Sequence, residues 1–456
     1  MRAQRQYSTS SSTCRGAATF RRCVDPSSCA HWCSRCPQAA THPPPLSKEE
    51  RQALFAKCFA RTRDTAHATG WFHFAPESAI HRENVVEWIL WALFSTSRAG
   101  AADEWREEIE EYVQRIEHLL GRKLAPGWNA GVDCIKVTLD PVTALHRPLL
   151  WYMVVGLVDL ITSMHLVANG FKHYTLHRWF CYFPPRFLNL FWARSPHPHI
   201  SYWYRPHRST TKKPIVFFHG IGIGLWPYLP FFTDIIARDP DVGILAIENL
   251  PISMRISPPP LARPAMLDGL ALLLSHHGLD RFVVCGHSYG TVVAAHVMRC
   301  PALAARATGW LLVDPIPFLL HLPAVAHNFV YRAPRGAHEW QLWYFASRDA
   351  DIARALARHF FWAESTLWRE DLAGRRVAVA LGARDQIVDA PEVRAYLTGG
   401  AGGGRPRGDV EAWTGDGGRL QVLWYPALDH AMVFDTARAR RPMVEILARF
   451  VGADVA

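Results

Sequence analysis

Residues 281–290 read Arg-Phe-Val-Val-Cys-Gly-His-Ser-Tyr-Gly, and this stretch decides the fold. The apolar run Val283 to Cys285 predicts a buried strand that leads directly into the pattern G-x-S-x-G, with Ser288 at its centre. Between a strand and a helix, this pattern marks a sharp turn that exposes the serine hydroxyl above a sheet. The run from Thr291 to Met298 predicts the helix that follows. We therefore expect Ser288 to be a nucleophile.

An activated serine needs a base and an acid that orients the base. Around such a turn they follow in the chain order serine, acid, histidine. Asp385 comes after a predicted strand at 376–382, and His430 comes after the last predicted strand at 420–426. A neutral imidazole can accept the serine proton, and a carboxylate can fix its tautomer. The predicted catalytic residues are Ser288, Asp385 and His430.

Other interpretations of these residues stay open at this point. Asp314, at the end of a predicted strand and followed by Pro315, is an alternative acid or a turn residue. Asp389 and Asp429 are weaker candidates. In the purely structural interpretation Ser288 is a turn serine, His430 is one of 23 histidines, and Asp385 is an ion-pair partner.

The stretch 214–224 supplies a second loop for this chemistry. An apolar run, Pro214 to Phe218, ends in His219-Gly-Ile-Gly222, where glycines let backbone N–H groups converge on one point. We assign the oxyanion hole to the backbone N–H groups of Ile221 and Tyr289. His219 is expected to organise the loop, because the base should lie downstream.

These motifs together resemble the α/β-hydrolase superfamily, with a domain of the AB hydrolase-1 type, over roughly residues 200–450. The resemblance implies an α/β fold with a mostly parallel, doubly wound sheet and no cofactor. The chain is also similar to a group of fungal proteins with this domain, in the stretches 201–207, 339–347 and 359–364.

Alternating apolar and helical segments support the same fold class. Strands are expected at 201–206, 214–219, 243–249, 281–286, 309–314, 376–382 and 420–426. Residues 316–372 form an aromatic-rich insertion, expected to be a lid over an apolar substrate tunnel or else a helical extension packed as ordinary core. The stretch from Gly399 to Gly418 is expected to be a flexible surface loop.

The chain before residue 201 divides into two predicted regions. Residues 1–45, rich in Arg and Ser, form a disordered or targeting tail, and a mitochondrial address is one interpretation. Residues 46–200 form a helical region in which Ser47 and Glu50 make a capping box and Gly121 ends a helix. Residues 149–168 are apolar and long enough to span a bilayer, although Asp159 and His165 interrupt them. This helix is either transmembrane, interfacial or buried.

Composition narrows the class of partner. The formal charge of +10 is spread along the chain and accompanies no nucleic-acid-binding module, so we expect no nucleic-acid partner. Aromatic residues make up 12%, with 18 Trp, which favours apolar grooves or a membrane-facing surface. Five of the ten cysteines lie between Cys14 and Cys36, and the other five are scattered singly along the chain. A secreted disulfide framework would distribute cysteines in pairs, so this pattern fits a reduced intracellular compartment. No second cysteine cluster follows at zinc-finger spacing, so we predict no metal site.

The expected function is that of a serine hydrolase acting on esters or related acyl bonds of an apolar, lipid-like or small-molecule substrate. One alternative is an acyltransferase that uses the same site. Another is a membrane-associated scaffold whose hydrolase domain is inactive.

Overall fold

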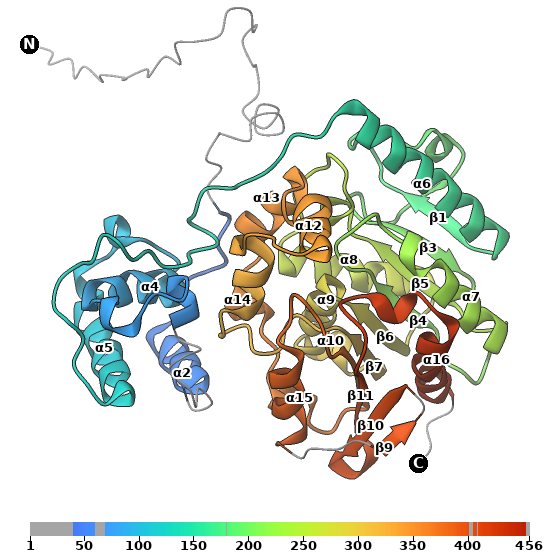
Figure 1. Ribbon diagram of the computed structural model, residues 1–456. Coiled ribbons are helices and arrows are strands. Elements are labelled where there is room, and N and C mark those ends of the chain that lie inside the picture. The colour runs from blue at the N-terminus through green and yellow to red at the C-terminus, as the bar shows by residue number, and fades with distance from the viewer. Residues whose placement is uncertain (1–39, 60–68, 179, 401–404, 408, 453–456) are drawn as a thin grey trace, which may run out of the picture.

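The computed structural model describes residues 40–59, 69–178, 180–400, 405–407 and 409–452. Most of the predicted tail, including the Cys14–Cys36 cluster, lies outside these residues. Three parts are visible in Figure 1: a unit of helices from the N-terminal part of the chain, a large sheet flanked by helices, and a group of short helices between them.

The centre of the molecule is an eleven-stranded sheet in the order β2-β1-β3-β5-β4-β6-β7-β8-β11-β10-β9. The six strands from β5 to β11 in this order are parallel, and the strands at both edges pair mostly antiparallel. The strands are β1 Lys172–Thr175, β2 Ala193–Arg194, β3 Ser201–Arg205, β4 Ile215–Phe218, β5 Ile244–Glu248, β6 Phe282–His287, β7 Ala307–Val313, β8 Val377–Gly382, β9 Arg405–Arg407, β10 Val410–Gly415 and β11 Leu420–Tyr425.

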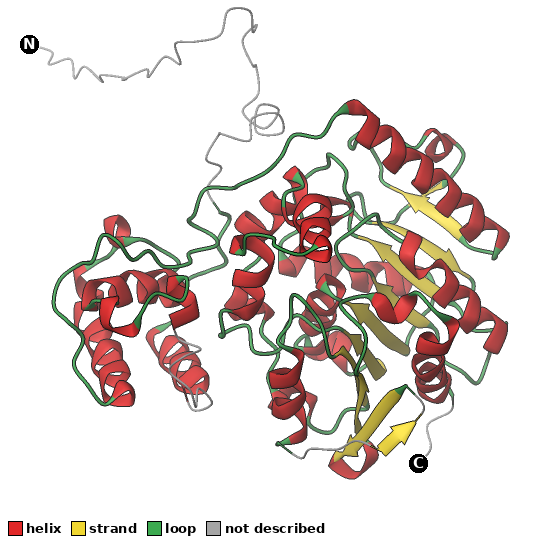
Figure 2. Ribbon diagram, viewed as in Figure 1, coloured by secondary structure: helices red, strands yellow, loops and turns green. Residues whose placement is uncertain are grey.

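Helices cover both faces of the sheet (Figure 2). The central strands are apolar on both sides, so alternate residues enter different cores: Val216 and Phe218 of β4 pack on one face, and Ile215 and Phe217 on the other. The first face carries α8 Arg263–His276, α9 Tyr289–Met298, α10 Pro301–Ala304 and α15 Ala390–Thr398, and the second carries α7 Leu229–Arg238 and α16 Ala437–Val451. The predicted α/β class with a mostly parallel, doubly wound sheet is confirmed.

The long insertion after β7 consists of short helices and connecting loops. Two of them, η8 and η9, are π-helices. The elements are α11 Ala324–Ala326, η8 His327–Tyr331, α12 Ala337–Leu342, η9 Trp343–Ser347, α13 Ala350–His359, α14 Trp362–Ser365 and the 3₁₀ helix η10 Arg369–Leu372.

The N-terminal helices have a core of their own, which includes Phe55, Trp91 and Tyr112. The expected capping box is present: the Glu50 backbone N–H donates to Ser47 Oγ at 3.2 Å, and the Ser47 N–H donates to Glu50 Oε2 at 2.8 Å. The main helices are α2 Lys48–Phe59, α4 Arg82–Phe94 and α5 Arg106–Leu120, with 3₁₀ turns η1 Gly70–Phe72, η2 Glu77–Ala79, η3 Arg98–Gly100 and η4 Asp103–Trp105.

Two sequence-based boundaries differ from the structure. The sheet begins before residue 201, because β1 pairs antiparallel with β3 and brings residues 172–175 into it. The expected flexible loop up to Gly418 contains β10, which pairs antiparallel with β11. Both segments lie next to the edge strands of the sheet, and both are short and interrupted by polar residues, so an apolar pattern does not reveal them.

Residues 149–168 form helix α6 Leu149–Ala168, which lies along the outside of the molecule beside β1 (Figure 1). Within the described residues it is the one helix with the length and composition to cross a membrane, at a mean hydropathy of 1.6. The remaining 3₁₀ turns are η5 Phe187–Leu190, η6 Trp226–Tyr228, η7 Leu250–Ile252, η11 Asp416–Gly418 and η12 Met432–Phe434.

Candidate active site

Ser288 lies on the turn between β6 and α9, with φ 51° and ψ −123°. This left-handed backbone is strained for a residue with a side chain, and such strain is typical of functional turns. Two glycines make the turn tight enough. A Cβ on Gly290 would lie 2.1 Å from the carbonyl oxygen of Phe218, and a Cβ on Gly286 would lie 2.9 Å from the carbonyl oxygen of Gly290. Close packing at this turn therefore requires glycine at both positions of the G-x-S-x-G pattern.

The structure brings the three predicted catalytic residues together. His430 Nε2 lies 2.8 Å from Ser288 Oγ, and His430 Nδ1 lies 2.6 Å from Asp385 Oδ2. The carboxylate can only accept, so Nδ1 carries a proton and donates it to Asp385, and Nε2 of the neutral ring accepts from the serine hydroxyl. The Asp385 and His430 side chains are 1% and 10% exposed.

The loop after β8 fixes the acid. Asp385 Oδ1 accepts hydrogen bonds from the backbone N–H groups of Ile387 at 2.8 Å and Val388 at 2.9 Å. Asp429 Oδ1 accepts from the N–H groups of Gln386 and His430 at 2.9 and 2.7 Å, which ties the acid loop to the histidine loop. The orientation of the Asp385–His430 pair is therefore set by the backbone on both sides.

Asp314, the alternative acid, lies close by but makes different bonds. Its Oδ1 accepts from the Gly382 N–H at 3.0 Å and its Oδ2 from the Ala431 N–H at 2.8 Å. The carboxylate joins the end of β8 to the histidine loop, and within the described residues the His430 ring makes its hydrogen bond to Asp385 instead. Asp389 caps α15 by accepting a hydrogen bond from the Glu392 N–H at 3.2 Å.

Burial of the His430 ring opposes its positive charge, but the Asp385 carboxylate outweighs burial, and Asp314 and Asp429 add to it. Together they raise the pKa of His430 to about 9. The neighbouring His287 shows the opposite case, because burial lowers its pKa. The neutral imidazole that can take the serine proton therefore becomes the major form only in alkaline solution.

The loop after β4 packs directly on the serine. A Cβ on Gly220 would lie 2.8 Å from Ser288 Cβ, so only glycine lets the loop approach this closely. His219 accepts from the Asn249 N–H through Nε2 at 2.9 Å and donates from Nδ1 to the Gly220 carbonyl at 2.7 Å. His219 thus holds the loop against the end of β5.

Two backbone N–H groups are available near Ser288. Tyr289 is the first residue of α9, and the first N–H groups of a helix have no acceptor within it. Ile221 follows Gly220 in the loop, and its side chain, like that of Tyr289, lines the same cavity as Ser288. The oxyanion hole at the N–H groups of Ile221 and Tyr289 stays a prediction, since the helix N-terminus accounts for one free donor and the loop for the other.

Tyr228 and His287 were not singled out from the sequence. The Gly220 N–H donates to Tyr228 Oη at 2.9 Å, and Tyr228 Oη lies 2.7 Å from His287 Nδ1. The tyrosine hydroxyl therefore links the loop after β4 to the turn that carries the serine. The only signal in the sequence is the position of His287 inside G-x-S-x-G.

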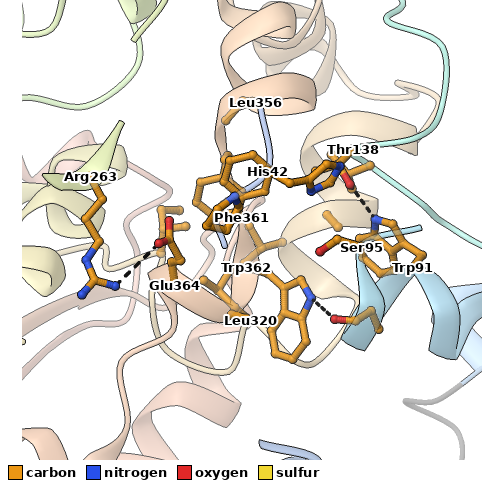
Figure 3. Close-up of a pocket in the computed structure, with 18 of the residues that line it drawn as sticks. His42, Trp91, Ser95, Thr138, Arg263, Leu320, Leu356, Phe361, Trp362 and Glu364 are labelled. Atoms are coloured by element: carbon orange, nitrogen blue, oxygen red, sulfur yellow. Dashed lines mark hydrogen bonds and ion pairs between the residues drawn. The ribbon is translucent and has the colours of Figure 1, made fainter. Parts of the chain in front are cut away.

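Ser288 lines a cavity of about 510 Å³. Most of the residues that line it are apolar, and Leu320, Leu356, Phe361 and Trp362 are among those shown in Figure 3. One wall comes from the insertion and one from the N-terminal helices. Trp362 Nε1 donates to the Ala92 carbonyl at 3.1 Å and joins the two walls. The apolar lining includes Trp91, Leu93, Phe94, Ile316, Leu320, Phe329, Leu356, Phe360, Phe361 and Trp362.

Asp314, Asp385 and His430 place ligand atoms within 4.8 Å of one another, a spacing that a divalent ion could use. However, all four carboxylate oxygens already accept hydrogen bonds, from the Gly382, Ala431, Ile387 and Val388 N–H groups and from the His430 ring. The cluster is therefore arranged as a hydrogen-bond network around the imidazole.

No family model matches the chain, and no curated protein matches it in sequence. Similar solved structures include a membrane phospholipase A described as a bacterial virulence factor, at 13% identity and TM-score 0.41, covering 66% of this chain and 93% of that one. Another is 2-hydroxy-6-oxo-6-phenylhexa-2,4-dienoate hydrolase from Rhodococcus sp. strain RHA1, at 16% identity and TM-score 0.36, covering 55% and 95%. A third is a carboxylesterase structure from Nitrososphaera gargenis, at 14% identity and TM-score 0.35, covering 56% and 97%. None of these likenesses says what this chain acts on, and its relationship to the fungal group stays a prediction.

Proposed function

We propose that the protein is a serine hydrolase that cleaves ester or related acyl bonds of an apolar substrate. The observation that carries this proposal is the hydrogen-bonded series Asp385–His430–Ser288, with the serine on a strained turn at the floor of an apolar cavity. A serine, a base and an orienting acid in this order are the parts that acyl transfer requires.

In the first half of the reaction, Ser288 Oγ forms a bond to the carbonyl carbon while its proton passes to His430 Nε2. The carbonyl oxygen becomes an oxyanion, held by the N–H groups of Ile221 and Tyr289. When the tetrahedral intermediate collapses, the bond to the leaving oxygen breaks and His430 returns its proton to that oxygen. An alcohol leaves, and the acyl group stays on Ser288.

In the second half, a water molecule gives a proton to His430 Nε2 and attacks the acyl carbon. The Ser288–acyl bond breaks, the serine recovers the proton, and a carboxylic acid leaves. Asp385 keeps its negative charge throughout and stabilises the imidazolium that forms at each stage. Each oxyanion donor is expected to contribute about 2.7–4 kcal/mol to the transition state.

The substrate class follows from the cavity. Its walls carry Leu320, Leu356, Phe361 and Trp362, and they suit an acyl or alkyl chain. The polar side chains at one end are Arg263 and Glu364, which face each other across 3.8 Å (Figure 3). We infer a substrate with an apolar chain beside the scissile bond.

Acyl transfer to an alcohol uses the same groups and differs only in which acceptor attacks the acyl-enzyme. The ratio of transfer product to acid, measured with a competing alcohol in water, separates the two reactions. A scaffold without activity is disfavoured, because each catalytic position holds a competent residue within hydrogen-bond distance of the next.

The test is hydrolysis of nitrophenyl esters of increasing acyl length by the full chain and by Ser288→Ala. We expect turnover with wild type and loss of turnover with Ser288→Ala. The matched control is Ser275→Ala, at an exposed position on α8, which should behave as wild type. Equal rates for wild type and Ser288→Ala would refute the assignment.

A further inference from the structure

Helix α6 exposes an apolar face to solvent and buries several polar residues, which is the reverse of the pattern usual for a surface helix. A surface helix of a globular protein turns apolar residues inward and polar residues to solvent. In α6 three of the five buried residues are polar, namely Asp159, Thr162 and Ser163, and the other two are Val155 and Leu166. The exposed residues are large and apolar, and they recur every three or four positions along one face: Leu149, Leu150, Met153, Val154, Leu157, Leu160, Ile161, Met164 and Val167.

The buried face is held by ion pairs. Asp159 pairs with Arg186 and with Arg255, and Arg186 Nη1 also donates to Glu248 Oε2 at 2.8 Å. His173 Nε2 lies 3.0 Å from the same Glu248 oxygen. Burial opposes ionisation of Asp159, but the two guanidinium groups outweigh it and lower the pKa of the carboxyl. The acid that interrupts the apolar stretch therefore anchors α6 to the protein.

The exposed apolar surface continues beyond the helix on one side. The segment 180–191 packs against α6: the rings of Tyr152 and Phe183 lie 5.4 Å apart, and Gly156 faces Pro184. Phe191 in this segment is 85% exposed and Phe187 is 68% exposed.

On the other side, the surface reaches the insertion that covers Ser288. Trp151 of α6 stacks on Phe345 with ring centroids 5.4 Å apart, and Tyr344 lies edge-on to Trp151 at 5.8 Å. Phe345 is 46% exposed and Trp340 is 51% exposed. One apolar surface thus joins the segment 180–191, the outer face of α6 and the insertion, and we call it the α6 surface.

In the stretch that carries α6 and the segment 180–191, the exposed charged side chains have one sign. Asp159 is the only acidic residue between positions 141 and 200, and it is buried in its ion pairs. The exposed basic residues of the same stretch are Lys172, Arg178 and Arg194. Exposed basic residues in the same stretch as an exposed apolar face are complementary to anionic lipid headgroups above a hydrocarbon layer.

We propose that the α6 surface lies on an anionic lipid bilayer, with α6 parallel to the membrane plane and its apolar side chains in the region between headgroups and acyl chains. The helix does not cross the membrane. Crossing would pull Asp159 away from Arg186 and Arg255, and it would leave the charges of Asp159 and Arg255 without their ion-pair partners. Lying flat keeps the ion pairs and covers every exposed residue of the outer face at once.

Vesicle binding by the full chain tests this. With vesicles of phosphatidylcholine and phosphatidylserine in about a 2:1 ratio, we expect binding about tenfold tighter than to phosphatidylcholine alone at low salt. The double variant Phe187→Ser/Phe191→Ser should lower the partition coefficient by about tenfold or more. The control Leu119→Ser/Leu272→Ser changes two residues that are 53% and 44% exposed elsewhere and should bind as wild type. Ser288→Ala should also bind as wild type, so this result is independent of the proposed reaction.

The depth of α6 residues in the bilayer distinguishes a helix that lies flat on the membrane from one that spans it. Met153 and Val167 are 14 positions apart, so about 21 Å separates them along the helix axis. A fluorescent amino acid placed at either position should be quenched equally by quenchers attached at one depth in the lipid. Unequal quenching that places the two positions on opposite sides of the bilayer would overturn the proposal. So would failure of wild type to bind vesicles, or a dimer in solution that the Phe187→Ser/Phe191→Ser variant dissociates, because the occupant would then be a second copy of the chain.

Discussion

Two buried charge clusters lie at different places around the same sheet, and they are built differently. Beneath α6, the carboxylates of Asp159 and Glu248 face the guanidinium groups of Arg186 and Arg255. At the candidate active site, two carboxylates surround a single imidazole. The first cluster is balanced, two negative charges against two positive ones, and the second has an excess of negative charge.

The difference decides what each cluster can do. In the balanced cluster burial opposes the carboxylate charges, but Arg186 outweighs it and holds the pKa values of Asp159 and Glu248 below their usual range. Burial also lowers the pKa of His173. These groups do not change charge near neutral pH, so the cluster fixes architecture. The unbalanced cluster raises the pKa of His430 to about 9 and gives the site a group that can move a proton.

The largest effect on activity is expected from substitutions in the unbalanced cluster at the candidate active site. His430→Ala should lower kcat by about 10⁵- to 10⁶-fold, because it removes the base of a cooperating triad. Asp385→Asn should lower kcat by about 10⁴-fold through the wrong tautomer of His430. Steady-state ester hydrolysis measures both, with the exposed His199→Ala as the control that should match wild type. A loss of less than tenfold in His430→Ala would show that the imidazole is not the base of the reaction.

Removing a charge from the balanced cluster beneath α6 should lower the stability of the folded protein. Asp159→Ala leaves the buried Arg255 guanidinium without its carboxylate partner and Arg186 with Glu248 alone, so we expect the free energy of unfolding to fall by about 3–5 kcal/mol. Urea unfolding followed by circular dichroism measures this. Asp103→Ala is the matched control, because Asp103 pairs with Arg106 at a site where the side chains are 96% and 80% exposed, and its unfolding midpoint should not change. Equal midpoints for all three proteins would mean that the cluster does not anchor α6.

The pH profile of kcat/KM should rise to a plateau above the pKa of His430, which is about 9. The direction follows from the reaction, since a raised pKa favours the protonated ring and the base must be neutral. Activity is therefore lost as pH falls through this value, and kcat/KM at pH 7 should be about a hundredfold below the plateau. A profile that is flat from pH 6 to pH 9 would contradict this picture of the cluster.

A smaller effect is expected for Asp314→Asn, which removes one negative charge near His430 without removing its hydrogen-bonded acid. The rising limb of the pH profile should move to lower pH by about one unit. Asp416→Asn is the control, because Asp416 pairs with Arg369 at the surface and its loss should leave the limb in place. If the rising limb does not move in Asp314→Asn, the charge of Asp314 does not affect the pKa of His430, and the role of this carboxylate is limited to its hydrogen bonds with the backbone.

Much of the fold follows from short-range pattern. The seven predicted strands correspond to seven observed ones because each is an apolar run that ends at a turn residue. The capping box at Ser47 and the left-handed Gly121 at the end of α5 depend on neighbours in the sequence, and both predictions are confirmed. The G-x-S-x-G pattern predicts Ser288, and the chain order serine, acid, histidine after successive strands predicts Asp385 and His430.

The rest depends on contacts between distant residues. Asp314 and Asp385 both follow strands, and only the backbone hydrogen bonds of the two loops decide which carboxylate meets the imidazole. The N-terminal wall of the cavity rests on contacts such as that between Trp362 and Ala92, 270 positions apart. The apolar pattern of residues 149–168 does not say which face of the helix is outward. That depends on the partners of Asp159, which come from residues 186 and 255.

The most direct test of the central claim is the site of covalent modification by a fluorophosphonate, located by mass spectrometry on the full chain. The reagent needs a serine whose proton is removed by a neighbouring base. We expect the adduct on the peptide that contains Ser288 in wild type, faster formation as the pH rises toward 9, and no adduct in His430→Ala. An adduct that forms on another serine, or that forms on Ser288 equally fast without His430, would contradict the account.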